Sequence, residues 1–181
     1  MTNDFNRLQA VNRYKGLSIA NAELSNITAL AAEICEASIA IISLIDDQQE
    51  IFISAQGTDK NSVELDTSFC ISNFLAEPVV TISDVANHKR FANADLATVA
   101  PHIRFYAGAK LTSPAGHIVG RLYVLDQKPK QLTKGQESCL QMLAKQVIQS
   151  LEKEIHLKTS QQQLTQLMSQ QLRTPAAAYQ Y

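Results

Sequence analysis

Two extended runs joined by a short turn segment most constrain the fold of this chain. The runs Ile103–Leu111 and His117–Asp126 are rich in residues that favour strands, and they flank the segment TSPAG. Pro114 fixes the φ angle that a turn needs, and Gly116 can adopt a positive φ without a steric penalty. The sequence therefore predicts an antiparallel β-hairpin at residues 103–126.

Three further segments are predicted to be strands. SIAIISLIDD, at residues 38–47, is dense in β-branched residues and is broken by Asp46 and Asp47. EIFISAQG resumes the extended pattern up to Gly57, which predicts another hairpin. EPVVTISD, at residues 77–84, predicts a short strand, followed to Pro101 by a loop with a helical turn.

Helical periodicity marks both ends of the chain. Apolar residues recur at three and four positions over Asp4–Tyr14 and Ala22–Cys35. A long helix is predicted from Thr133 as far as Thr174, where Pro175 ends it because a proline restricts its predecessor and lacks an amide proton.

A further helix is predicted over LDTSFCISNFL, at residues 65–75, with Asp66 or Thr67 as its N-cap. The order of elements predicts an α+β domain, in which helices pack against a mostly antiparallel sheet.

The ordered segments resemble the GAF domains of bacterial signalling proteins. The resemblance covers Arg7–Leu151 and is carried by RLQAVNRY, ASIAIISLIDDQQEIFISAQG, TSFCISNFL, ISDVANHKRFAN, PHIRFYAGAKL and GHIVGRLYVLDQKPKQLT. It implies a five- or six-stranded antiparallel sheet, with the N- and C-terminal helices on one face and a small-molecule pocket on the other. It also implies a role in sensing or dimerisation. Many relatives have D-x-x-x-D-P-R-F where this chain begins with Asp84, and here His88 and Lys89 replace the second acid and the proline.

Five polar or aromatic residues are candidates for ligand contacts on the predicted sheet. Strand alternation places Arg104, Tyr106 and Lys110 on polar sides of the sheet, with Arg121 and Tyr123 on the next strand. If that side is covered, these residues could hold an anionic or aromatic ligand through hydrogen bonds and stacking. If it is open, they form a solvated face, which is common in antiparallel sheets.

Cys70 is the candidate reactive thiol. It lies in SFCIS on the predicted helix that would face the pocket, where a partly exposed thiol at a helix start can have a lowered pKa. This leaves open a small thiol-dependent redox enzyme, such as a free methionine sulfoxide reductase. Buried structural cysteine is the commoner role, and Cys35 and Cys139 lie on other predicted helices rather than on mobile loops.

The sequence motifs do not indicate a metal site or a bound cofactor. His88, His102, His117 and His156 have no metal-ligand spacing, so no metal is expected. The Cys-His pair of bilin-binding relatives and the Asn-Lys-Phe-Asp-Glu signature of cyclic-nucleotide-binding relatives do not occur, so no cofactor is expected.

Charge and hydropathy favour neither nucleic acid nor membrane as a partner. The chain has 16 basic and 17 acidic residues, well mixed along its length. The N-terminus has no apolar core of signal-peptide length, and no run has the roughly 18 apolar residues of a membrane-spanning helix. We therefore expect a cytoplasmic protein.

The segment MSQQLRTP, at residues 168–175, resembles the M-S-H-E-L-R-T-P motif of the phosphoacceptor helix in sensor histidine kinases. Six of its eight residues match in register, but Gln170 replaces the phosphoacceptor histidine and Gln171 the neighbouring acid. An amide nitrogen is not a nucleophile at neutral pH, and we expect no ATP-binding domain to accompany this helix. We therefore expect a GAF-like sensor domain at residues 1–155, then a helical extension and tail at 156–181 that is a degenerate, truncated phosphoacceptor helix without kinase activity.

A homodimer is predicted from the last helix, with a signalling protein as a possible further partner. Its apolar stripe consists of Leu140, Leu143, Val147, Leu151 and Ile155. Because the sheet can cover one side of the helix only, a parallel partner helix is expected to cover the remainder.

Overall fold

The computed structural model describes residues 2–17, 22–64, 77–88 and 102–171. Its elements, in chain order, are α1 (Thr2–Lys15), α2 (Ala22–Ile34), β1 (Ile39–Ile45), β2 (Gln49–Gln56), β3 (Ser62–Glu64), β4 (Val79–Ile82), the 3₁₀ turn η1 (Val85–Asn87), β5 (Phe105–Thr112), β6 (Ile118–Asp126) and α4 (Lys134–Gln171). Both predicted hairpins, the strand in residues 77–84 and the three helices at the ends of the chain are confirmed. The helix predicted at residues 65–75 lies outside the described residues.

The strands form one six-stranded sheet in the order β3-β2-β1-β6-β5-β4, and every neighbouring pair is antiparallel. The two hairpins meet at its centre, where β1 pairs with β6 and Ser43 lies opposite Arg121. All seven residues of β1 are buried, because both faces of this strand are covered. The sheet confirms the α+β fold.

The turn of the second hairpin is built as its glycine predicts. Gly116 has a φ of +83°, and its N–H donates to the carbonyl oxygen of Ser113 at 2.9 Å. Gly57 also has a positive φ, +79°, and a Cβ there would lie 2.2 Å from the carbonyl oxygen of Ser38. Only glycine fits at Gly57, which explains why β2 ends there.

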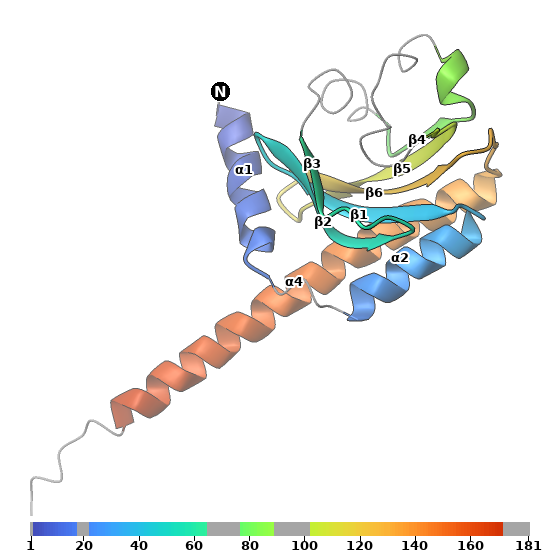
Figure 1. The fold of residues 1–181 in the computed structure, drawn as a ribbon. Helices are drawn as coiled ribbons and strands as arrows, with labels where there is room; N and C mark the ends of the chain where they lie inside the picture. Colours follow the sequence, from blue (N-terminus) through green and yellow to red (C-terminus); the bar gives the residue numbers. More distant parts are fainter. Residues whose placement is uncertain (1, 18–21, 65–76, 89–101, 172–181) are drawn as a thin grey trace, which may run out of the picture.

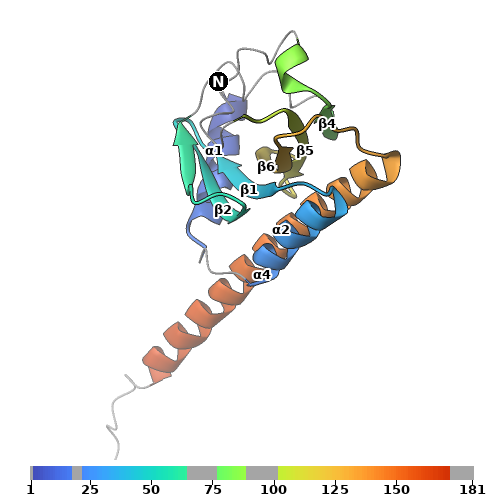
Figure 2. The same cartoon turned by 45° about the vertical axis from the view of Figure 1, so that its right-hand side comes forward.

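Helices α2 and α4 lie side by side along one face of the sheet, and α1 stands beside them at one end (Figures 1 and 2). The main core lies between these helices and the sheet. It is formed by apolar side chains from α1 (Val11, Tyr14), α2 (Leu24, Ile27, Ala31), α4 (Leu140, Val147, Leu151) and the strands (Leu44, Phe105, Leu111, Leu122, Val124).

The apolar stripe of α4 packs into this core instead of facing a partner helix. Leu140 and Val147 are 0% exposed and Leu151 is 2% exposed, and Leu143 and Ile155 pack against the same core. The prediction that a partner helix covers this stripe is therefore not needed, because α1, α2 and the sheet bury three of its residues fully and Leu143 and Ile155 in part.

The distal half of α4 carries a different apolar set. The helix has 38 residues, which corresponds to a length of about 57 Å, and it projects well past the sheet (Figure 1). Every residue from Thr159 to Gln170 is exposed. Leu157, Leu164, Leu167 and Met168 have 55–60% of their surface exposed. Apolar surface thus lies on the part of α4 that has left the domain.

The start of α4 is fixed by a capping box. The Oγ1 of Thr133 accepts from the N–H of Gln136 at 3.2 Å, and the Oε1 of Gln136 accepts from the N–H of Thr133 at 2.9 Å. This reciprocal pairing satisfies two backbone donors. It confirms the helix start predicted at Thr133.

Candidate functional site

A buried ion pair lies at the centre of the sheet face opposite the helices. Arg121 on β6 and Glu50 on β2 form a fork: the Nε of Arg121 donates to Oε1 of Glu50 at 2.9 Å, and its Nη2 donates to Oε2. Ser43 on β1, between them, donates its hydroxyl to Oε1 at 2.6 Å. The side chains of Glu50 and Arg121 are only 1% and 8% exposed. The carboxylate therefore neutralises the guanidinium in a place that water barely reaches.

Two tyrosines pack beside this pair. The rings of Tyr106 and Tyr123 stack with centroids 5.7 Å apart. The guanidinium carbon of Arg121 lies 4.7 Å from the Tyr123 centroid and 5.8 Å from that of Tyr106, within the range of a cation–π contact. Its Nη1 also donates to the Tyr106 hydroxyl at 3.5 Å. Both tyrosines are 1% exposed, so this side of the sheet is closed rather than solvated.

Neighbouring groups stabilise the positive charge of Arg121. Burial opposes the charged form of the guanidinium, but the charge of Glu50, the hydrogen bonds to Glu50 and the electrostatic interactions with Tyr106 and Tyr123 more than offset that effect, so the pKa of Arg121 is raised well above its usual value. Glu50 engages both nitrogens of the guanidinium edge that faces it. The arrangement offers a closed, neutral surface of stacked rings rather than an exposed cation.

Close packing shapes the surface next to the rings. A Cβ on Gly108 would lie 2.2 Å from the Tyr106 hydroxyl oxygen, because the tyrosine folds back across this glycine. Around the polar centre, apolar side chains complete a second core, formed by Ile39, Ile41, Phe52, Ile82, Val85, Ile103 and Leu125.

The structure brings together three of the five residues predicted from strand alternation. Tyr106, Arg121 and Tyr123 form the cluster just described. Arg104 lies just before β5 and binds Asp84 through two hydrogen bonds, Nε to Oδ1 at 2.8 Å and Nη2 to Oδ2 at 2.7 Å. This pairing, principally the hydrogen bonds, lowers the pKa of Asp84.

Lys110 lies away from the cluster. It is near the other end of β5, in a groove of about 220 Å³ that it lines together with Gln141 and Lys145 of α4. Neither Arg104 nor Lys110 is part of the tyrosine cluster, because alternation gives the side of a strand and not the position along it.

Cys70, which is also a candidate ligand contact and is the basis of the redox alternative, lies outside the described residues. The other two cysteines are described. Cys35 is buried and Cys139 is half-buried. Burial raises the pKa of Cys35 to about 11, so its thiol stays protonated near neutral pH and is a poor nucleophile.

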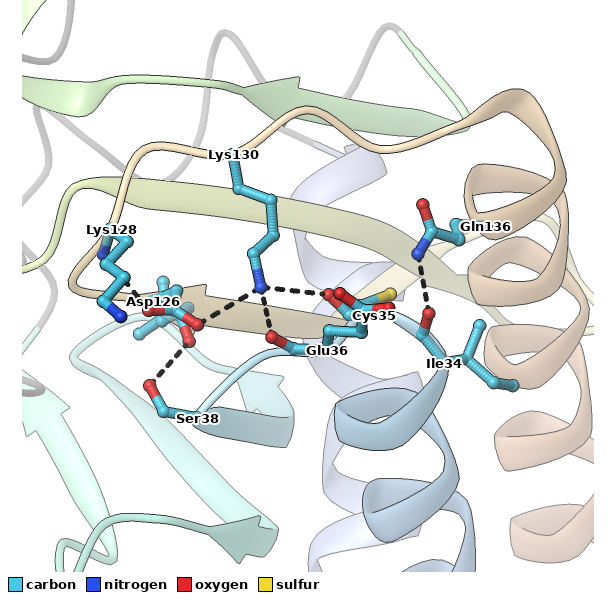
Figure 3. A network of polar contacts seen from close by, with 9 residues as sticks. Ile34, Cys35, Glu36, Ser38, Asp126, Lys128, Lys130 and Gln136 are labelled. Atoms are coloured by element: carbon cyan, nitrogen blue, oxygen red, sulfur yellow. Dashed lines mark hydrogen bonds and ion pairs between the residues drawn. The ribbon is translucent and has the colours of Figure 1, made fainter.

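A second polar network joins the end of α2 to the segment that leads into α4 (Figure 3). The ammonium of Lys130 donates to the carbonyl oxygens of Cys35, at 3.5 Å, and Glu36, and it contacts Asp126 Oδ2 at 3.4 Å. Carbonyls at a helix C-terminus have no partner within the helix and carry partial negative charge. Lys130 therefore caps α2 and ties it to the end of β6.

The first turn of α4 makes a similar contact. The Nε2 of Gln136 donates to the carbonyl oxygen of Ile34 at 2.8 Å, as Figure 3 shows. One side chain from the β6–α4 connection and one from the first turn of α4 thus bind three successive carbonyl oxygens, those of Ile34, Cys35 and Glu36, at the end of α2 and just beyond it. This network positions α2 and α4 relative to each other.

Within the described ranges, no group of three or more His, Cys, Asp or Glu side chains is arranged to hold a metal ion. Among the same residues, no helix has the length and apolar character required to cross a bilayer.

Comparison with known proteins identifies the family of this chain. The family model described as GAF domain matches residues 20–151. A cyclic di-GMP phosphodiesterase of Pseudomonas aeruginosa is 32% identical over 111 residues, which is 61% of this chain and 19% of that protein. The chain therefore spans about a fifth of the length of this curated relative.

Two solved structures share the fold. The blue-light absorbing form of the PixJ GAF domain of Thermosynechococcus elongatus superposes with a TM-score of 0.63 at 14% identity, covering 89% of this chain and 96% of that one. A domain of a putative two-component sensor histidine kinase of Sinorhizobium meliloti superposes with a TM-score of 0.60 at 15% identity, covering 80% and 99%. At such identities the likeness concerns the fold alone.

Proposed function

The chain belongs to the GAF domain family, and we propose that it is a non-catalytic sensory module of bacterial signal transduction. In this proposal the module responds to a small molecule at the closed face of the sheet, and its last helix passes the response to a partner copy and an output protein. The observation that carries the proposal is the change in α4 from a buried core helix to an exposed one beyond Lys158.

Helix α4 is suited to transmitting a signal, because the same rigid helix forms part of the domain core and also extends beyond it. Its proximal half packs on β5, α2 and β6, and its distal half extends into solvent. A shift in how the sheet and α2 pack against the proximal half would therefore move the distal half as a body. The ties from Lys130 and Gln136 to the end of α2 support such coupling.

A parallel homodimer through distal α4 is the form we propose for the assembly. Leu157 and Leu164 are seven residues apart, and Leu167 follows three residues later, which is the spacing of a two-stranded coiled-coil seam. All three are more than half exposed. A second copy would bury this seam, which a partner-free helix leaves in water.

Sedimentation tests the dimer. Leu164→Glu is expected to shift a dimer at micromolar concentration to a monomer, because it places like charges at the seam. Gln166→Glu, which adds the same charge two residues away on the opposite side of the helix, is expected to leave the dimer intact. A monomeric unaltered protein, or equal effects of both variants, would contradict the proposal.

The ligand is proposed to contact the stacked rings of Tyr106 and Tyr123. Because Glu50 already neutralises Arg121, a planar, uncharged group fits this cluster better than an anion does. Both tyrosine rings are buried in this structure, so a ligand could reach them only after a change in the packing on this face of the sheet. Native mass spectrometry of the purified protein, before and after denaturation, would identify a small molecule that is released. Binding that survives Tyr123→Leu unchanged would argue against this site.

The tail resembles the phosphoacceptor helix of histidine kinases, and the chain matches part of a phosphodiesterase. Both likenesses support a regulatory role for this module next to a separate output domain. Gln170 stands where a histidine would accept phosphate, so we propose that the chain itself carries neither kinase activity nor a phosphoacceptor. The match to the Pseudomonas aeruginosa protein covers only a fifth of its length. This supports a module that regulates an output domain rather than a catalytic unit.

A further inference from the structure

A cavity of about 80 Å³ lies on the helix side of the sheet, where α1, α2, α4 and the β1–β2 hairpin meet. Its apolar lining comprises Leu17, Leu24, Leu44, Ile53 and Leu151, together with the ring of Tyr14. We propose that this cavity binds a short alkyl group, and that its occupancy sets how α1 packs against α4.

Water is a poor occupant of this cavity. Its volume would admit about two or three waters, but each buried water needs two to four polar partners. Among the described residues that line the cavity, only Tyr14 and Lys15 carry polar side-chain atoms. The Tyr14 hydroxyl donates to Glu152 and the Lys15 ammonium binds Asp46 at 2.6 Å. Apolar cavities of this kind stay dry and accept apolar molecules.

The volume limits the size of the ligand. Cavities of about 150 Å³ lined by aliphatic side chains accept benzene, and this one has about half that volume. It therefore suits xenon or an alkyl group of about three or four carbons. The group could belong to a small free molecule or be the end of a longer chain that leaves through the mouth near Lys15, whose side chain is 33% exposed.

The cavity lies at the joint that holds α1 in place. The Nη1 of Arg7 donates to the carbonyl oxygen of Ile45 at 2.7 Å. Lys15 binds Asp46 at the β1–β2 turn, and Tyr14 reaches Glu152 on α4. These polar contacts flank a space with few van der Waals contacts. A group that fills it would add dispersion contacts to both helices and so favour one packing of α1 on α4.

This site is distinct from the tyrosine cluster. Leu44 and Ile53 point to the helix face, whereas their chain neighbours Ser43 and Phe52 belong to the opposite face, because successive side chains of a strand alternate. The two sites can therefore be tested independently, and failure of one leaves the other untouched.

Methyl NMR of the full chain, with ¹³C-labelled Leu and Ile, provides the test. We expect xenon and 1-butanol to shift the methyl signals of Leu24, Leu44, Leu151 and Ile53, and to leave those of Ile41 and Leu125 unchanged. Octanoate binding at least tenfold tighter than 1-butanol would identify the end of a longer chain as the ligand. Equal binding would identify a small free molecule. Both results support the site.

Ile51 on β2 also lines the cavity and is half-buried, so Ile51→Phe should fill the cavity and abolish these shifts. Val80→Phe is a matched control, because it adds an aromatic ring at a half-buried position on β4. It should preserve them. The absence of shifts in the unaltered protein, their appearance at Ile41 and Leu125 instead, or their persistence in Ile51→Phe would each overturn the proposal.

Discussion

Replacing Arg121 by methionine should destabilise the domain strongly. The substitution keeps most of the side-chain volume but removes the partner of Glu50, whose side chain is 1% exposed. Glu50 would keep the hydrogen bond from Ser43 and lose both bonds from the guanidinium. Leaving one charge of a buried pair without its partner typically costs about 3–5 kcal/mol. For a domain of this size, that corresponds to a fall in Tm of roughly 6–20 °C.

A double-mutant cycle separates the pair from the packing around it. Glu50→Gln alone should also destabilise, because it leaves a buried guanidinium uncompensated. The double variant Glu50→Gln/Arg121→Met should lose less stability than the sum of the two single losses, since it leaves no buried charge without its partner. Urea unfolding followed by circular dichroism measures all four free energies.

Arg104→Met is the matched control. Arg104 also forms two hydrogen bonds to a carboxylate, but its side chain is 39% exposed, so water can replace the lost partner. We expect a much smaller loss of stability than for Arg121→Met, because solvent screens an exposed ion pair. A loss below about 1 kcal/mol for Arg121→Met, or a double variant with the sum of the two single losses, would refute the reasoning about the buried pair.

Four further outcomes are expected. Gly116→Val should lower the Tm by a few degrees, because a Cβ at φ +83° is strained by about 1–2 kcal/mol, although no atom lies within 4 Å of it; an unchanged melting curve would contradict this. Burial alone would raise the pKa of Asp46, but hydrogen bonds from Lys15 and the backbone hold it below its usual value. Its stabilisation is therefore complete above the unfolded pKa of about 3.9 and is lost as pH falls through the folded pKa, so Asp46→Asn should flatten the acid limb of a pH–stability curve. Cys35, with a pKa of about 11, should react slowly with iodoacetamide at pH 7.5, as measured by peptide mapping. Rapid labelling would contradict the burial of this thiol. A related kinase catalytic domain with ATP and magnesium should put no acid-labile phosphate on the chain, and Gln170→His alone should restore little; labelling of the unaltered chain would contradict the proposed loss of the phosphoacceptor.

The fold was largely predictable because its elements carry strong local patterns. The TSPAG segment and Gly57 marked the hairpin and the strand end, since each needs a special backbone conformation. Strand β3, Ser62–Glu64, was not predicted, because three residues are too few for periodicity to show. Thr133 marked the start of α4, since its hydroxyl and Gln136 form a local capping box.

The site was less predictable than the fold. Alternation placed Tyr106, Arg121 and Tyr123 on one side, but it could not distinguish them from Arg104, which lies before the strand. Glu50 was missed because it follows Asp46–Gln49, a polar run that indicates a turn. Only the pairing of β1 with β2 and β6 brings Glu50 across Ser43 to Arg121.

The spacing of apolar residues along α4 also did not predict which elements pack against its apolar stripe. The stripe around Val147 suggested a partner helix, but α1, α2 and the sheet cover it. The exposed residues Leu157, Leu164 and Leu167 form a sparser set, separated by glutamines and other polar residues. These three residues could be recognised as a seam only after the tertiary structure had shown that the other apolar residues of α4 pack into the core.

Disulfide crosslinking along distal α4 tests the central proposal of a parallel signalling dimer most directly. In a variant whose three cysteines are replaced by alanine, Leu164→Cys should form an intermolecular disulfide rapidly under mild oxidation, because equivalent seam positions face each other in a parallel pair. Gln166→Cys, on the opposite side of the helix, should remain mostly reduced. Equal crosslinking at both positions, or none at position 164, would contradict the account.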